Sequence, residues 1–515
     1  MISTRPGFEP KKAALPGTRL GVLEKTRTWI NGTDEDANLE SRAFLLLGKA
    51  GTGKSTIAHS LVQEFKQLRR LGAFFRFSLL TDIGPEHFFR TIARSIADLD
   101  PSYATVLMNF ADSTLNTTTS PTRQLTELLT KPFKTLSALG PIVVVIDALD
   151  ECPADHRLEL IQCLQENIML FPKSIRFIIT SRPSEAAYLR GCSWVHTYDL
   201  ESDVSVDQDI HKFVKSQLVH SATNQLLHGF DDERVDSIVA SAEGLFQYAA
   251  VVCKEILDVG SSWKESPFQV YTHLVTAGSR GLDALYLNIL GASFSSFTKP
   301  QLEGFRQVMG RILHSQEPLS QQMLMNFDLV QMTKKHSSLV ASDSSDQDNH
   351  GLVPIILQSL GTLLGGMEDN HSRIFPLHSS FCDFLLEETK SAQFFIGLKS
   401  SHHISLASIS LHIMERDLHF NMASLENSYL PNSAIPDFEK RVKAGVSCTL
   451  LYTCQYWTTH LKMSQITEAQ FVDIAKIHHF IDVFLVFWFE VLALERCTNW
   501  AAKSLNFLCQ WSKVS

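Results

Sequence analysis

The chain has 515 residues, of which 44% are hydrophobic and 20% charged, a balance that suits a globular protein with a large buried core. This length corresponds to roughly three or four domains. The formal net charge is −9 and no block of Lys and Arg stands out, so the composition gives no support to a general role in binding nucleic acid.

Cysteine usage and hydropathy predict where the protein works. The nine cysteines form no CxxC pair, and their odd number favours free thiols in a reducing compartment over a disulfide framework. The N-terminus lacks the apolar core of a secretory signal. Residues 480–494 are the most apolar late stretch, but they are too short for a membrane span and carry Asp482 and Glu490, so we expect a buried helix. We therefore predict a cytoplasmic protein without a membrane span.

The first 204 residues predict an α/β domain. Residues 1–17 are rich in Pro, Gly and charge, which indicates a disordered tail. Over 18–204, strand-like apolar runs then alternate with helical patterns, which predicts a parallel sheet covered by helices on both faces. The runs are AFLLL (43–47), AFFRF (73–77), IVVVI (142–146), IRFII (175–179) and WVHTY (194–198). A polar loop is expected over 111–122.

Residues 48–55 read GKAGTGKS, the pattern G-x-x-x-x-G-K-S, between a strand-like run and a helical stretch. Glycines let backbone N–H groups curl inward around phosphate oxygens, and the start of the helix directs its positive end at the same place. The lysine adds a cation for the β- and γ-phosphates, and the serine hydroxyl can ligate Mg²⁺. The alternative, a chance match, is rare for this string. We predict that ATP or ADP with Mg²⁺ is bound by Gly48, Gly51, Thr52, Gly53, Lys54, Ser55 and Thr56.

The run PIVVVIDALDEC supplies acids for that site. A buried parallel strand that ends in Asp147 can hold the water shell of Mg²⁺ beside Ser55, which makes these two residues the predicted metal ligands. Asp150 and Glu151 follow, and either can orient or deprotonate an attacking water. The alternative is a strand end capped by a solvated acidic turn.

Arg182 is the third candidate, in the run IRFIITSRP. An arginine at the carboxyl end of a strand faces the crevice where open α/β sheets bind their ligands, so it can sense the γ-phosphate. The alternative is a surface arginine in a turn.

After about residue 205 the pattern becomes helical. Residues 209–220, 234–257 and 282–293 are amphipathic, and residues 400–515 are helical by pattern with many aromatic side chains. Residues 333–351 read as an exposed polar loop. The adjacent pair His402/His403 does not suggest a metal site, because adjacent residues on a helix diverge.

Together, the three nucleotide motifs resemble those of the NACHT class of signal-transducing P-loop ATPases, also called STAND proteins and related to NLR proteins. DALDE (147–151) and TSRP (180–183) match the aspartate and sensor-arginine motifs of that class. The closest likeness is to fungal members, whose P-loop region is nephrocystin-like. These begin with Gly-Thr-Arg before a helix ending in Trp, as residues 17–29 do, and carry a Phe-rich second strand, as residues 72–78 do.

The resemblance extends into the helical part. In AEGLFQYAA (242–250), Phe246 stands where many relatives have a proline that touches the nucleotide base. FPLHSSFCDFLLEE (375–388) resembles the winged-helix motif whose histidine reads the β-phosphate of ADP, which would be His378 here, although a lone histidine is more often simply packed near a surface. Ser379 stands where many plant relatives have aspartate. The domains implied are a nucleotide-binding domain (18–204), a helical domain (205–280), a winged-helix domain (281–395) and a second helical domain (396–515).

The function implied by the resemblance is an ATP/ADP switch whose nucleotide state controls domain opening and homo-oligomerisation, with slow hydrolysis, in signalling of the innate-immunity or incompatibility type. Two alternatives stay open: an ATPase in which turnover itself is the function, and a helical scaffold with a vestigial site. Relatives usually add an effector domain and a repeat sensor, which this sequence does not show. We therefore expect either a piece of a longer gene product or action through partner proteins of unknown identity.

Overall fold

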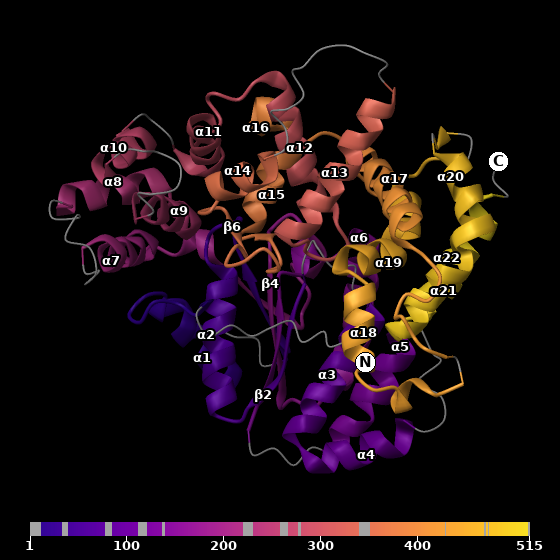
Figure 1. The fold of residues 1–515 in the computed structure, drawn as a ribbon. Coiled ribbons are helices and arrows are strands. Elements are labelled where there is room, and N and C mark those ends of the chain that lie inside the picture. The colour runs from indigo at the N-terminus through magenta and orange to yellow at the C-terminus, as the bar shows by residue number, and fades with distance from the viewer. Residues whose placement is uncertain are drawn as a thin grey trace. The chain divides into compact units, whose positions relative to one another are not determined.

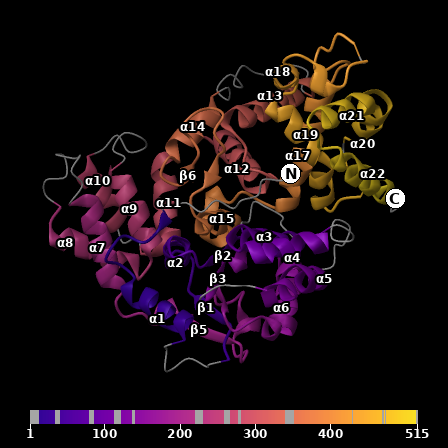
Figure 2. The same cartoon turned by 90° about the horizontal axis from the view of Figure 1, so that it is seen from below.

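The computed structural model describes residues 12–32, 40–77, 85–111, 121–135, 140–219, 230–257, 266–276, 280–338, 351–427, 429–467, 470–471 and 473–512. The chain divides into two compact units. The first is Met1–Ile289 together with His378–Ser380, and the second is Leu290–Leu377 and Phe381–Ser515. Figures 1 and 2 show the elements of each unit.

A five-stranded parallel sheet forms the centre of the first unit (Figure 1). Its strands are β1 (Ala43–Leu47), β2 (Leu71–Arg76), β3 (Ile142–Asp147), β4 (Ile175–Ser181) and β5 (Val195–Asp199), in the order β2-β3-β4-β1-β5. Each predicted strand run is therefore a strand, and the predicted parallel sheet flanked by helices is confirmed.

The central strands are apolar throughout because helices cover both of their faces. Every residue of β1 and β3 is buried, and alternate side chains of β3 enter two separate cores. Val143 and Val145 pack in the core beneath α1 (Leu20–Asn31) and α2 (Lys54–Gln67). Val144 and Ile146 pack in the core of α3 (Pro85–Leu99) and α6 (Ala154–Asn167) on the opposite face, as Figure 2 shows.

The remaining helices of the first unit follow the predicted pattern with one break. They are α4 (Pro101–Ala111), α5 (Pro121–Gln124), α7 (Val206–Leu218), α8 (Asp232–Ala242), α9 (Phe246–Leu257), α10 (Pro267–Tyr271) and α11 (Gly281–Ser293), whose last turn belongs to the second unit. The amphipathic pattern over 234–257 is two helices, because Glu243 and Gly244 adopt φ of 47° and 77° and end α8.

Two predicted irregular segments differ in part from the structure. Within the predicted tail, residues 12–17 are described, and the Ala14 N–H donates to Ser60 Oγ at 2.9 Å. The predicted loop over 333–351 begins later than expected, because α13 (Gln321–Ser338) continues to Ser338. Residues 1–11, 112–120 and 339–350 lie outside the described part.

The described residues of the second unit form helices and one short hairpin. This unit contains α12 (Lys299–His314), α13, α14 (Leu352–Ser359), most of α15 (Ser379–Leu386), α16 (Glu388–Ser391), α17 (Lys399–Asp417), α18 (Phe438–Gly445), α19 (Cys448–Met463), α20 (Ile474–His479), α21 (Leu485–Leu494) and α22 (Asn499–Trp511). The antiparallel pair β6 (Leu364–Gly365) and β7 (Phe375–Pro376) forms the hairpin. The predicted helical C-terminal region is confirmed, whereas the winged-helix assignment and the finer domain boundaries stay predictions.

The apolar stretch over 480–494 is not the buried helix that we expected. It is part of a continuous helical segment, Ile474–Leu494, of which 28% is buried in its most apolar window. Trp488 and Val491 are buried, but Val486 is 72% exposed. By length and composition this segment could cross a membrane, although a single such helix is weak evidence for a span.

A cluster of buried histidines lies in the core of the second unit. His403 on α17 and His460 on α19 face each other, with 2.9 Å between their Nδ1 atoms. The Tyr452 hydroxyl accepts the Gln316 N–H and can donate its own hydrogen to His460 Nε2 at 2.8 Å. The His314 ring lies 5.6 Å from the His403 ring. The described residues offer no group of three metal ligands here.

These histidines are held neutral. Burial, helped by the neighbouring imidazoles and Lys399, lowers the pKa of His314 to about 3 and that of His403 to about 4. An unfolded histidine has a pKa of about 6.5, so the unfolded chain takes up protons first as the pH falls. The stability contributed by the cluster is therefore fully present above about pH 6.5 and is lost as the pH falls toward the folded values.

We predict that the free energy of unfolding falls between pH 7.5 and pH 5 by up to about 1.4 kcal/mol per pH unit for each such histidine. His314→Leu should reduce the proton uptake on unfolding by about one, because it removes a titrating ring from the core. Urea unfolding of the full chain at several pH values measures this slope. The exposed His371→Ala is the control and should keep the wild-type slope. An unchanged slope in His314→Leu would contradict the prediction.

Candidate nucleotide-binding site

The phosphate loop runs from the end of β1 to the start of α2 and has the backbone conformation that glycine permits. Gly51 and Gly53 have φ of 86° and 90°. A Cβ on Gly48 would lie 2.6 Å from Thr52 Oγ1, so a side chain at this position would displace the Thr52 hydroxyl. No side chain caps the N-terminus of α2, which leaves its first N–H groups available to an anion.

Lys54 and Thr52 bond to the loop itself. Lys54 Nζ donates to the carbonyl oxygens of Gly48 at 2.7 Å and Lys49 at 2.8 Å. Burial lowers the pKa of the Lys54 ammonium, with Asp150 as the largest opposing influence. Thr52 is buried and its hydroxyl donates to the Lys49 carbonyl, while Thr56 lies in the first turn of α2. The negative charge of a bound polyphosphate would favour the charged form of Lys54, which burial disfavours.

Asp147, the last residue of β3, is fully buried. Its Oδ1 accepts hydrogen bonds from Ser55 Oγ at 3.1 Å and Thr180 Oγ1 at 2.6 Å. Its Oδ2 has no hydrogen-bond partner among the described residues. A buried carboxylate oxygen beside a serine hydroxyl is a donor set that suits Mg²⁺, so the predicted pair fits the ion and would hold it through oxygen ligands.

Asp150 and Glu151, either of which the sequence allows as the acid that orients or deprotonates the water, have different surroundings in the turn after β3. Asp150 Oδ2 pairs with Arg182 Nε at 2.8 Å, so this acid holds the predicted sensor arginine. Glu151 lies in the same turn, and burial raises the pKa of its carboxyl to about 7, against the opposing charge of Arg76 and a hydrogen bond with Ser379. Of the two, Glu151 is therefore better suited to accept a proton near neutral pH.

His378 and its two successors belong to the first unit, although nearly two hundred residues separate them from Arg182. Arg182 Nη2 donates to Ser379 Oγ at 3.2 Å. His378 Nδ1 accepts the Ser380 N–H at 3.1 Å, and Ser380 Oγ lies 2.8 Å from the Tyr286 hydroxyl. Burial and the charges of Lys54, Arg182 and Arg76 lower the pKa of His378 to about 3. The ring is therefore neutral, and its remaining proton is on Nε2, a hydrogen-bond donor.

The structure thus places the phosphate loop, the acids, Arg182 and His378 at the carboxyl edge of the sheet. Sequence reasoning missed Arg76, the last residue of β2, which pairs in register with Asp147 and places its Nε 3.8 Å from Asp147 Oδ2. The only sequence signal was a charged residue inside the aromatic run AFFRF. Phe246, which stands where many relatives have the base-contacting proline, has the Arg19 guanidinium 4.7 Å from its ring centroid.

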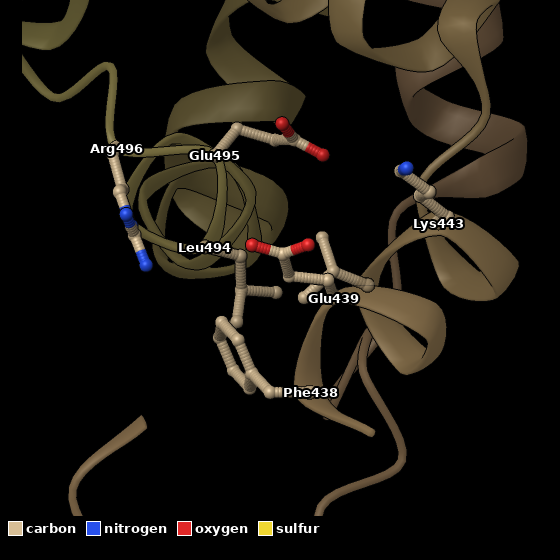
Figure 3. A pocket seen from close by; sticks show the side chains of 7 residues that line it. Phe438, Glu439, Lys443, Leu494, Glu495 and Arg496 are labelled. Carbon is tan, nitrogen blue, oxygen red and sulfur yellow. The ribbon is translucent and has the colours of Figure 1, made fainter. Parts of the chain in front are cut away.

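A cavity in the second unit is lined by none of these residues. It has a volume of about 280 Å³ and lies between α18 and the end of α21. Its lining is Phe438, Glu439, Val442, Lys443, Leu494, Glu495 and Arg496. Figure 3 shows the two glutamates beside its apolar residues. With two acids and two bases in its lining and none of the predicted site residues, it is not the nucleotide site.

The sheet order, the glycine loop and the buried strand-end aspartate define the first unit as a P-loop nucleotide-binding domain. Residues 19–182 match the family described as nephrocystin 3, N-terminal. The match ends at Arg182 and includes the phosphate loop and Asp147. The predicted nephrocystin-like P-loop region is therefore confirmed for this segment.

Solved structures give weaker similarities. Drosophila ORC bound to DNA shares 12% identity over 71% of this chain and 87% of its own, with a TM-score of 0.33. Cdc6p from Pyrobaculum aerophilum shares 13% over 76% and 97%, with a TM-score of 0.32. The ORC2 protein of Aeropyrum pernix, in ADPNP–ADP complexes, shares 14% over 70% and 90%, with a TM-score of 0.34. No curated protein sequence matches the chain.

Asp147→Asn tests the metal site. The amide keeps the size of the side chain but removes the charge that attracts Mg²⁺, so we expect ATP affinity in the presence of Mg²⁺ to fall by about 10- to 100-fold. Affinity measured with EDTA should change little. Titration calorimetry with and without Mg²⁺ measures both, and the exposed Asp155→Asn is the control. A variant that still gains affinity from Mg²⁺ as wild type does would contradict the assignment.

Proposed function

We propose that this protein is an ATP/ADP-operated switch of the NACHT type. The observation that carries the proposal is the position of His378–Ser380, which lies with Lys54, Arg182 and Glu151 at the edge of the sheet. A site used for turnover alone has no need of a distant tripeptide at this place.

The contacts of His378–Ser380 would respond differently to ADP and to ATP. The neutral His378 ring offers Nε2–H as a donor to the terminal phosphate of ADP. Arg182 pairs with the carboxylate of Asp150, which carries one negative charge, and donates to the neutral hydroxyl of Ser379. A γ-phosphate carries more charge than the Ser379 hydroxyl and would compete for the same guanidinium. ATP would therefore weaken a contact that ADP leaves in place.

This difference is what a switch requires, because a ligand shifts an equilibrium only by its differential affinity for the two states. In the proposed cycle, ADP favours the state in which His378–Ser380 lies at the site. ATP favours release of the tripeptide, which frees the second unit to assemble with further copies of the chain. Slow hydrolysis returns the protein to the ADP state. Protein partners would supply the input and read the output.

A second candidate, in which turnover itself is the function, is favoured by one observation. Burial raises the pKa of the Glu151 carboxyl to about 7, while Arg182 pairs with the neighbouring Asp150. Such a group can act as a general base near neutral pH.

The switch predicts a nucleotide-dependent size. Wild-type protein should elute from a size-exclusion column as a smaller species with ADP than with a non-hydrolysable ATP analogue. Lys54→Ala should show no dependence on nucleotide, because it loses the phosphate cation. His378→Ala should form the larger species even with ADP. His371→Ala, an exposed histidine seven residues earlier, is the matched control. Identical elution of wild type with both nucleotides, at saturating binding, would overturn the switch.

Hydrolysis tests Glu151. Glu151→Gln should lower the single-turnover rate by about 100-fold or more and leave KM nearly unchanged, because a general base acts in the transition state. Since the carboxyl must be ionised to accept a proton, the wild-type rate should rise through about pH 7 and then level off. The variant should lose this rise, and the exposed Glu159→Gln should keep it. A Glu151→Gln enzyme with the wild-type rate and pH profile would exclude this role.

A further inference from the structure

The side chain of Arg19 is buried, although long charged side chains are seldom buried in proteins. Arg19 precedes α1 with a left-handed φ of 56°, and the residue is 3% exposed. Its own N–H donates to Asp209 Oδ2 at 2.8 Å, which fixes the start of α1 against α7. Such a conformation is costly for a non-glycine residue unless its surroundings hold it.

The guanidinium joins three parts of the first unit. Nη2 donates to the carbonyl oxygen of Thr52 in the phosphate loop at 2.7 Å. Nη1 pairs with Asp203 Oδ2 at 3.0 Å, just before α7. The plane lies over the ring of Phe246, the first residue of α9, at 4.7 Å from the centroid.

The contact with Thr52 bears on the orientation of the loop. A phosphate loop works by turning its N–H groups inward, and its peptide carbonyls must then point away from the anion. A charged donor on such a carbonyl stabilises this peptide orientation by a hydrogen bond about twice as strong as a neutral one. The neighbouring carbonyl, that of Gly51, accepts the Gln247 N–H of α9 at 3.1 Å. Two consecutive loop carbonyls are therefore held from outside.

Arg19 is not placed to bind the phosphates directly. Its charge is already balanced by Asp203, with Asp209 beside it. Its hydrogen bond to the loop goes to a carbonyl oxygen rather than toward the cradle of N–H groups.

We infer that Arg19 is a positioning residue, which holds the phosphate loop in its anion-binding conformation and makes phosphate affinity depend on the contacts of α7 and α9. The inference rests on the proposed nucleotide site. It adds the contacts that connect this site to α7 and α9.

The test compares a phosphate-only probe with a full nucleotide. Titration calorimetry is done with Mg²⁺-pyrophosphate and with Mg²⁺-ADP on the full chain. Arg19→Met should weaken both by the same factor, about 10- to 100-fold, because the loop is affected before any base or ribose contact. Arg19→Lys, which keeps one charged donor, should recover part of the loss. Arg27→Met is the matched control, since Arg27 lies on α1, the helix that Arg19 precedes, in a partly exposed ion pair with Glu64.

The dependence on α7 is tested by a double-mutant cycle. Asp203→Asn touches Arg19 but not the loop, so it should weaken pyrophosphate binding by itself and add little to Arg19→Met. Amide hydrogen exchange of residues 48–56 should rise in both variants while β1 and β3 stay protected. If Arg19→Met does not fold, Arg19→Lys and Asp203→Asn give the same comparison.

Two results would overturn the inference. One is a loss of ADP affinity with unchanged pyrophosphate affinity, which would make Arg19 a contact to the nucleoside. The other is full additivity of the two substitutions. Failure of the proposed nucleotide site looks different, because wild-type protein would then bind neither probe. Failure of the switch alone would leave both affinities measurable and would show only as identical elution with ADP and the ATP analogue.

Discussion

The carboxylate of Asp147 is the constraint around which the first unit is arranged. It ends a strand in which every residue is buried and has no exposed surface, so its charge must be met by protein groups or by a cation. Thr180 on β4 and Ser55 on α2 each donate to one of its oxygens. The other oxygen has no hydrogen-bond partner among the described residues. A buried ionised group with incomplete compensation is costly, and Mg²⁺ would remove that cost.

The charges around this carboxylate also explain why the edge of the sheet suits a polyphosphate. Lys54, Arg76 and Arg182 lie near Asp147, Asp150 and Glu151 at this edge. Burial works against the ionised forms of both Lys54 and Glu151. An entering anion with its metal would favour the ammonium of Lys54. The same field keeps His378 neutral, so its contribution to binding is a hydrogen bond and not a charge.

Much of the first unit was predictable because its signals are local. β-branched and aromatic runs indicate strands buried on both faces, and the pattern G-x-x-x-x-G-K-S between a strand and a helix indicates a phosphate-binding loop. Arg76 was not predictable, because its place beside Asp147 depends on the register of strands seventy residues apart. Nor was the role of Arg19, which depends on contacts across nearly two hundred residues. The prediction of a buried helix over 480–494 was wrong, because composition does not show which faces of an apolar helix are covered by other helices.

The strength of the contacts at His378–Ser380 bears on how the proposed switch can work. Arg182 donates to the Ser379 hydroxyl, Glu151 also bonds Ser379, and the Tyr286 hydroxyl lies beside that of Ser380. A neutral hydrogen bond typically contributes about 1 kcal/mol net, and one that involves a charged group about 1.5–3 kcal/mol. A population shift from one state to the other needs about 5.5 kcal/mol of differential affinity. A γ-phosphate that takes over Arg182 can supply part of that difference, and loss of the His378 contact another part. Many strong bonds here would lock the tripeptide beyond the reach of any nucleotide. A few bonds of this size leave the equilibrium within the range that exchange of ADP for ATP can reverse.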